Sequence, residues 1–213
     1  MVDITWINHA GFLVSSGDNV IYFDPYQVGD DLPQASLILV SHEHHDHADV
    51  DSIRKLSDGS TVVACPKTCV KALKEFHPVG LEPGETKRVA GIPVTGFPAY
   101  TFPGKKFHPR ENQWLGYIIT IEGKKIYHAG DCDIMEEMKE LADTAIDVAL
   151  LPVGNKGYTM DFDDAARATK YIKPRVIVPM HDWDQDLDPF IDLVNEVAPG
   201  VRVEILRDKK LSI

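Results

Sequence analysis

One seven-residue segment, Ser41-His42-Glu43-His44-His45-Asp46-His47, constrains this chain more than any other feature. It directly follows the continuous apolar run at residues 37–40, which is typical of a strand buried on both faces. The segment contains four potential metal ligands: His42, His44, Asp46 and His47. One histidine in a loop would be unremarkable as a solvated side chain, but four such groups in this order after a buried strand indicate metal binding.

The spacing of these side chains favours two ions. His42 and His44 are two residues apart, so in an extended segment both imidazoles project to the same side and can converge on one cation. Asp46 and His47 follow where the chain must turn toward a helix, and they can converge on a second cation. Imidazole and carboxylate ligands suit Zn²⁺ or a similar first-row metal.

Each such ion needs about three protein ligands plus solvent, so we expect further ligands elsewhere in the chain. Five residues stand at the ends of expected strands or in a long loop: His9, His108, His128, Asp131 and His181. Gly130 allows the sharp backbone turn that would let Asp131 face a site.

The hydrophobic pattern predicts strands alternating with helices. Strands are expected at 4–7, 12–15, 20–23, 37–40, 61–64, 89–97, 114–121, 125–129, 148–153, 175–180 and 201–206. Helices are expected at 50–56, 66–76, 134–141, 161–172 and 189–197. This order predicts layered α/β packing with helices outside, and the length of 213 residues fits a single domain spanning 1–213.

Composition restricts the partners and the compartment. The formal net charge of −11 repels phosphate backbones, so we do not expect a general nucleic-acid binder. The N-terminus lacks the basic and apolar regions of a signal peptide, and no apolar run approaches the ~20 residues of a membrane span. Three cysteines do not form a disulfide scaffold, and reduced thiols fit a cytoplasmic protein. The sequence is compatible with a homo-oligomer as well as with a monomer.

Several motifs resemble one known family. The 41–47 segment resembles the His-x-His-x-Asp-His signature of the metallo-β-lactamase superfamily. Ala129-Gly130-Asp131 resembles its later Gly-Asp motif, and Pro179-Met180-His181 resembles its final histidine. Residues 6–12 and 23–25 are similar to the start of the ascorbate-6-phosphate-lactonase-like and N-acylphosphatidylethanolamine-phospholipase-D-like branches. Residues 127–131, 152–154 and 158–161 are similar to small hydrolases of that branch.

This resemblance implies an α/β fold, a four-layer αβ/βα sandwich of two mixed β-sheets with helices outside. It also implies two divalent metal ions, with Zn²⁺ expected and Mn²⁺ or Fe²⁺ as alternatives. The first ion would be held by His42, His44 and His108. The second would be held by Asp46, His47 and His181. Asp131 would bridge both ions.

The expected chemistry is hydrolysis of an ester, lactone or phosphodiester of a small molecule by a metal-activated hydroxide. Asp46 and Asp131 would then be catalytic as well as ligating. His9 and His128 are candidates for contact with the leaving group or, preferably, for support of a ligand. Asp24 is a candidate for orienting a ligating histidine, or it ends a strand in a turn.

Three rival functions remain. Diiron oxygen reductases of this superfamily carry Glu where this chain has His44, and a hard carboxylate suits iron better than imidazole. A nuclease or phosphodiesterase acting on nucleic acid suits the metals but not the acidic charge. A non-catalytic metal-binding protein would be expected to have lost ligands.

Three local features bear on substrate preference. Lys105, Lys106 and Arg110 form a basic patch in the long 98–112 loop, which either is solvated or captures the phosphate or carboxylate of an anionic substrate. Cys132 stands where the family often has Thr or Ser. Asn155-Lys156-Gly157 replaces a tighter glycine-rich turn.

Overall fold

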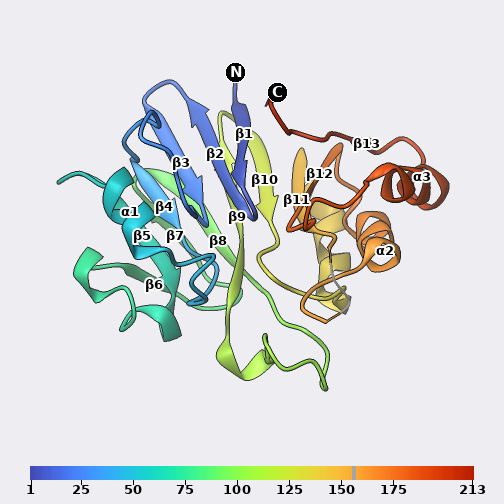
Figure 1. Ribbon diagram of the computed structural model, residues 1–213, viewed down its shortest axis with the longest axis horizontal. Coiled ribbons are helices and arrows are strands. Elements are labelled where there is room, and N and C mark those ends of the chain that lie inside the picture. The colour runs from blue at the N-terminus through green and yellow to red at the C-terminus, as the bar shows by residue number, and fades with distance from the viewer. Residues whose placement is uncertain (155–156) are drawn as a thin grey trace.

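Two seven-stranded β-sheets packed face to face form the centre of the protein (Figure 1). The computed structural model describes residues 1–154 and 157–213, so Asn155 and Lys156 of the divergent turn lie outside the described residues. The first sheet has the order β14 (Lys210–Ser212), β1 (Asp3–Asn8), β2 (Gly11–Ser16), β3 (Asn19–Phe23), β4 (Leu37–Leu39), β5 (Val62–Pro66) and β6 (Val79–Leu81). The second has the order β13 (Arg202–Val203), β12 (Val176–Met180), β11 (Val148–Pro152), β10 (Lys124–His128), β9 (Leu115–Ile121), β8 (Ile92–Pro98) and β7 (Thr86–Val89).

Both sheets are mixed, as predicted. In the first sheet, β3 to β6 pair in parallel and the remaining pairs are antiparallel. In the second sheet, β10 to β13 pair in parallel and the remaining pairs are antiparallel. Parallel strands in one sheet present their carboxyl ends at one edge, where α/β proteins place their ligand sites. The segments that follow β3, β4, β10 and β12 carry Asp24 and the expected metal ligands except His108, which lies in the loop after β8.

Helices cover the outer face of each sheet, which confirms the four-layer sandwich. Helix α1 (Val50–Leu56) packs on the first sheet through one apolar cluster. Helices α2 (Phe162–Ile172) and α3 (Asp188–Val197) pack on the second sheet through another. A third apolar cluster fills the space between the two sheets. In Figure 1 the chain termini lie at the top of the sandwich and the 98–112 loop lies at the bottom.

Two of the segments predicted as helices contain 3₁₀ structure in place of an α-helix. The predicted helix at 66–76 is replaced by two short turns, η1 (Lys67–Cys69) and η2 (Lys74–Phe76). The helix predicted at 134–141 is η4 (Glu136–Thr144), and its buried residues explain this geometry. Met135, Met138 and Leu141 recur at every third position, which matches the three residues per turn of a 3₁₀-helix. Within the described residues no helix has the length and apolar character to cross a membrane.

The strand predicted at 89–97 is mostly β8, but its first three residues are the end of β7 and the turn of a hairpin. Residues Ala90 and Gly91 have φ of 47° and 78°, so they form a tight turn between β7 and β8. Glycine is suited to this backbone, but alanine gave no sign of a left-handed conformation in the sequence. The sequence pattern also missed β6 and β14, and it made β13 longer than its two residues.

Candidate metal centre

The histidine-rich loop is anchored to both sheets where it leaves β4. The hydroxyl of Tyr117 on β9 donates a hydrogen bond of 2.8 Å to the carbonyl of Val40. The amide of Leu115 on the same strand donates to the carbonyl of Ser41 over 3.1 Å. Because these contacts fix the backbone immediately before the first histidine, the loop starts from a rigid position between the sheets.

One cluster of potential ligands contains His42, His44 and His108, whose ligand atoms lie within 4.8 Å of one another. Nε2 of His42 is 3.0 Å from Nδ1 of His44. His108 is delivered by the long 98–112 loop, where its carbonyl accepts a hydrogen bond from the Thr101 amide at 2.8 Å. Burial lowers the pKa of His42 and of His44, which favours the neutral imidazole that binds metals.

A second cluster contains Asp46, His47 and His181, as the resemblance implies, and also His9. Nε2 of His9 is 3.3 Å from Oδ2 of Asp46. Burial would raise the pKa of Asp46, but the contact with the His9 ring and the charge of His47 hold that pKa well below its usual range. His9 adopts a left-handed backbone with φ of 52°, and its carbonyl accepts a hydrogen bond from the His181 amide at 3.2 Å. The ligand set implied by the resemblance did not include His9, for which only contact with a leaving group or support of a ligand was expected.

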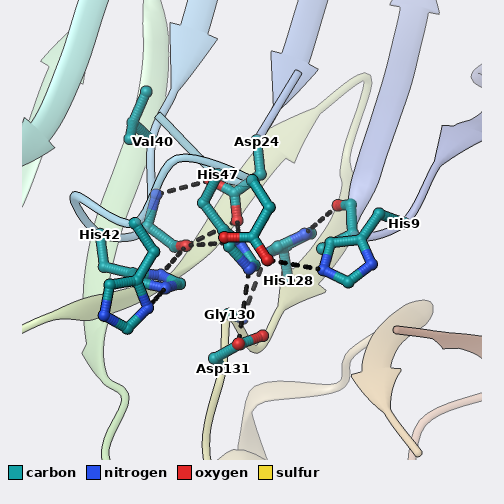
Figure 2. A network of polar contacts seen from close by, with 12 residues as sticks. His9, Asp24, Val40, His42, His47, His128, Gly130 and Asp131 are labelled. Carbon is teal, nitrogen blue, oxygen red and sulfur yellow. Dashed lines mark hydrogen bonds and ion pairs between the residues drawn. The ribbon is translucent and has the colours of Figure 1, made fainter. Parts of the chain in front are cut away.

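Asp131 lies between the two clusters. Its Oδ2 atom is 3.3 Å from Nε2 of His108, 3.4 Å from Nε2 of His47 and 3.2 Å from Nε2 of His181. Burial would raise the pKa of Asp131, but the neighbouring His181 and His47 outweigh it and lower that pKa well below the usual range. Figure 2 places His47 and Asp131 between His42 on one side and His9 on the other. This is the position expected of a bridging ligand.

Asp24 lies beside the candidate ligand His47 (Figure 2). This fully buried carboxylate accepts hydrogen bonds from the Ser41 amide at 2.6 Å, from the Ser41 hydroxyl at 2.6 Å and from Nδ1 of His47 at 2.7 Å. The Ser41 hydroxyl is also 2.9 Å from Nδ1 of His42. With both Nδ1 atoms turned toward Asp24 and Ser41, the Nε2 atoms are left to bind metal. Asp24 therefore combines the two roles considered for it, because its φ of 40° also ends β3 in a turn.

His128 belongs to none of these clusters. Its Nε2 donates to the carbonyl of Ala10 over 2.8 Å, and its Nδ1 accepts from the amide of Gly130 over 3.2 Å. The ring is fully buried and stacks on Phe23 with centroids 5.0 Å apart. Burial lowers the pKa of His128, which favours the neutral ring that this pattern requires. This placement favours the supporting role over contact with a leaving group, because the ring orients the turn before Asp131.

The donor atoms of the centre fit a metal ion. Among the described residues, six buried side-chain atoms here lack a hydrogen-bond partner: Nε2 of His9, Nε2 of His47, both ring nitrogens of His108, Oδ1 of Asp131 and Nδ1 of His181. Buried polar atoms left without partners are costly, and cation coordination is a common explanation. Nitrogen and carboxylate donors in this proportion suit Zn²⁺ or a similar first-row ion.

Two of the three cations in the basic patch are already paired with carboxylates. Lys105 forms an ion pair with the buried carboxylate of Asp133 and also donates to the carbonyl of Thr159 at 3.1 Å. Arg110 forms an ion pair of 2.9 Å with Glu137. Two of the three cations therefore stabilise the 98–112 loop, which carries His108. Lys106, whose Nζ lies 5.8 Å from the centroid of the Phe107 ring, is the cation of the patch that is left for contact with an anionic substrate.

Cys132 points away from the metal centre. Its side chain is fully buried in the apolar cluster between the second sheet and its helices. Burial raises the pKa of this thiol well above its ordinary value. The residue that follows Asp131 thus belongs to the apolar core of the protein.

A cavity of about 350 Å³ opens above the centre. Its lining includes His44, Asp46, His108, Asp131 and His181. The rest of its lining includes three aromatic side chains, Phe107, Tyr158 and Trp183, which our sequence analysis did not single out. Trp183 stands two residues after the expected ligand His181, and Phe107 stands one residue before His108, so proximity to the ligands was the available signal.

Known proteins resemble this chain over nearly its whole length. A family model described as a beta-lactamase superfamily domain matches residues 3–181. A protein named UPF0173 metal-dependent hydrolase from Pyrococcus furiosus is 34% identical over 96% of this chain and 100% of its own. The crystal structure of a putative metal-dependent hydrolase from Parabacteroides distasonis has a TM-score of 0.87 and 33% identity, covering 96% of this chain and 92% of that chain. Igni18, a metallo hydrolase from Ignicoccus hospitalis, has a TM-score of 0.80 and 26% identity, covering 100% and 99%.

Proposed function

This chain belongs to the beta-lactamase superfamily. From that membership we propose that it is a metal-dependent hydrolase with a dinuclear centre. The observation that carries the proposal is the position of Asp131 between two separate clusters of histidine and carboxylate ligands. The names of the relatives, which describe metal-dependent hydrolases, support the same activity.

We assign the first ion to His42, His44 and His108. The second ion goes to Asp46, His47 and His181. Asp131 would be the ligand shared by both, and Zn²⁺ is the ion that these donors suit best. When bound, the two ions would supply a hydroxide nucleophile near neutral pH and would polarise the carbonyl or phosphoryl oxygen of the substrate.

The protein's own residues prepare the site for this reaction. Asp24 and Ser41 fix the imidazoles of His47 and His42, so both rings present Nε2 without reorganisation. His9 holds Asp46 by its 3.3 Å contact and either orients that carboxylate or joins the second ion as a further ligand. His128 holds the turn that carries Asp131. The buried position of these groups limits the access of bulk water.

We propose a small ester, lactone or phosphodiester as the substrate. The cavity of about 350 Å³ lies in the size range of small-molecule pockets. Nucleic acid is disfavoured by the net charge of −11, and Lys105 and Arg110 already pair with carboxylates. A redox centre is disfavoured by the imidazole of His44, which stands where diiron members of the superfamily carry a glutamate.

A substrate panel tests the proposal. The Zn²⁺-loaded protein is incubated with chromogenic carboxylic ester, lactone, thioester, β-lactam and phosphodiester substrates, and bound metal is measured on the same sample. We expect hydrolysis of at least one substrate and its loss in His47→Ala and Asp131→Ala. His77→Ala is the matched control, because His77 is exposed and belongs to no cluster. Silence across the panel with two ions bound would favour a metal-binding protein without catalysis.

A further inference from the structure

The described residues expose few large apolar side chains, and they are not evenly spread. The exposed ones are Met1, Phe102, Phe107, Tyr158 and Trp183. The last three line the cavity above the metal centre. A single exposed aromatic ring needs no explanation, but a group of them beside a candidate catalytic centre is typical of a binding surface.

The three rings form a continuous row, which we call the aromatic wall. The ring centroids of Phe107 and Tyr158 are 4.6 Å apart, and those of Tyr158 and Trp183 are 6.5 Å apart. The row ends on the metal centre, because the Trp183 centroid is 5.1 Å from that of His181. Its members come from the long loop that carries His108, from the segment before α2, and from the loop after β12. Three distant segments thus converge on one apolar surface.

The backbone of Trp183 adds a second observation. Its φ of 52° is left-handed, a conformation that is unfavourable for a bulky side chain. With 54% of its surface exposed, Trp183 gains little from burial to offset that strain. Its neighbour Asp182 holds the loop in place by an ion pair of 2.6 Å with Arg207. Strain that persists at an exposed side chain beside a functional site indicates a role in ligand contact.

The charges around the cavity indicate which part of a ligand this surface contacts. Among the described residues, no lysine or arginine lines this cavity. Lys105 and Arg110 pair with carboxylates elsewhere, and Nζ of Lys106 lies 5.8 Å from the centroid of the Phe107 ring without lining the cavity. The carboxylates of Asp46 and Asp131 lie on the metal side of the same cavity. A ligand in the cavity would therefore contact charged and metal-binding groups on one side and uncharged aromatic rings on the other.

We propose that the aromatic wall is a subsite for an uncharged apolar group, attached directly to the carboxyl or phosphoryl centre that is hydrolysed. The substrate class is then a small amphiphile, with its reacting centre at the metals and a ring or hydrocarbon group on Phe107, Tyr158 and Trp183. This inference rests on the proposed hydrolase function, because the metals fix where the reacting centre lies.

Binding of product-like carboxylates tests the inference without requiring turnover. Benzoate and acetate share a carboxylate for the metals and differ in the apolar group. Calorimetric titration of the Zn²⁺-loaded protein should show benzoate binding about tenfold more tightly than acetate, as stacking and burial of one ring imply. The heat-capacity change of binding should be more negative for benzoate, because that change reports burial of apolar surface.

Variants of the wall locate the effect. Trp183→Ala should remove most of the benzoate preference and leave acetate binding and metal content unchanged, whereas Trp183→Phe should retain it. Phe107→Ala should weaken the preference as well. Phe102→Ala is the matched control, because Phe102 is exposed in the same loop as Phe107 but does not line the cavity.

The outcomes separate this inference from the hydrolase function. Equal affinity for benzoate and acetate would overturn the subsite, even if the substrate panel shows hydrolysis. A preference that survives in both Trp183→Ala and Phe107→Ala would overturn it as well. If the preference depends on the wall but the panel is silent with two ions bound, the subsite stands and the hydrolase function fails. If Trp183→Ala does not fold, the preference for benzoate over acetate is tested with Trp183→Phe, which should retain it, and with Phe107→Ala, which should weaken it.

Discussion

Replacement of Asp24 by asparagine is expected to weaken metal binding without unfolding the protein. The side chain of Asp24 receives the Nδ1 proton of His47 at 2.7 Å, as well as hydrogen bonds from the amide and hydroxyl of Ser41 at 2.6 Å each. In Asp24→Asn the amide oxygen can still accept from the Ser41 amide. The new NH₂ group then faces His47 and requires an acceptor there, so the proton of His47 moves to Nε2, the atom that faces Asp131.

A histidine protonated on Nε2 cannot ligate through that atom. Loss of a carboxylate that orients a metal ligand typically lowers metal affinity about 10- to 100-fold, or about 1.4–2.7 kcal/mol. We expect a loss of this size for the second ion, together with a nearly unchanged midpoint of urea unfolding for the metal-free protein.

The assay is a Zn²⁺ titration of the metal-free protein in competition with a chromogenic chelator. Asp49→Asn is the control, because Asp49 caps α1 outside the metal centre and asparagine caps helices about equally well. If Asp24→Asn binds two ions with wild-type affinity, the tautomer argument is wrong.

Three further results are expected. Lys105→Met should lower the free energy of unfolding by about 2–4 kcal/mol in urea titrations, because it leaves the buried carboxylate of Asp133 without its cation. The control Lys106→Met should change the free energy of unfolding by less than about 0.5 kcal/mol. Equal effects of the two substitutions would refute the reasoning. Gly116→Ala should lower the free energy of unfolding by about 1–3 kcal/mol, since the added Cβ would lie 2.6 Å from the carbonyl oxygen of His128. Gly29→Ala is the control and should not destabilise the protein, because a Cβ at Gly29 has no atom within 4 Å. Burial raises the pKa of the Cys65 and Cys69 thiols to about 12 and that of the Cys132 thiol well above its ordinary value. Because the folded protein then contains less thiolate at pH 8 than the unfolded chain, a thiol reagent should label none of the three cysteines in the native protein and all of them in urea. Rapid labelling of the native protein would contradict this.

The metal centre was predictable where its ligands are close in sequence. The order His42, His44, Asp46, His47 directly after a buried strand was enough to place two pairs of ligands. Asp131 and His181 were accessible because each follows an expected strand of the second sheet. The assignment of these residues to metals stays a prediction, as do the single-domain organisation, the cytoplasmic location and the oligomeric state.

Features created by tertiary packing were not predictable in the same way. The entry of His9 into the second cluster depends on contacts between β1 and the loop after β12, which lie far apart in sequence. The row of Phe107, Tyr158 and Trp183 likewise exists only where three loops meet. By contrast, the 3₁₀ geometry of η4 was present in the sequence as an apolar repeat of three, although we predicted a helix there without specifying its type.

Anomalous diffraction from crystals of the Zn²⁺-loaded protein, measured at the zinc edge, tests the dinuclear centre most directly. The account predicts two peaks per chain about 3.5–4 Å apart. One should lie among His42, His44 and His108, the other among Asp46, His47 and His181, with the carboxylate of Asp131 between them. A single peak at full occupancy, or peaks away from Asp131, would contradict it.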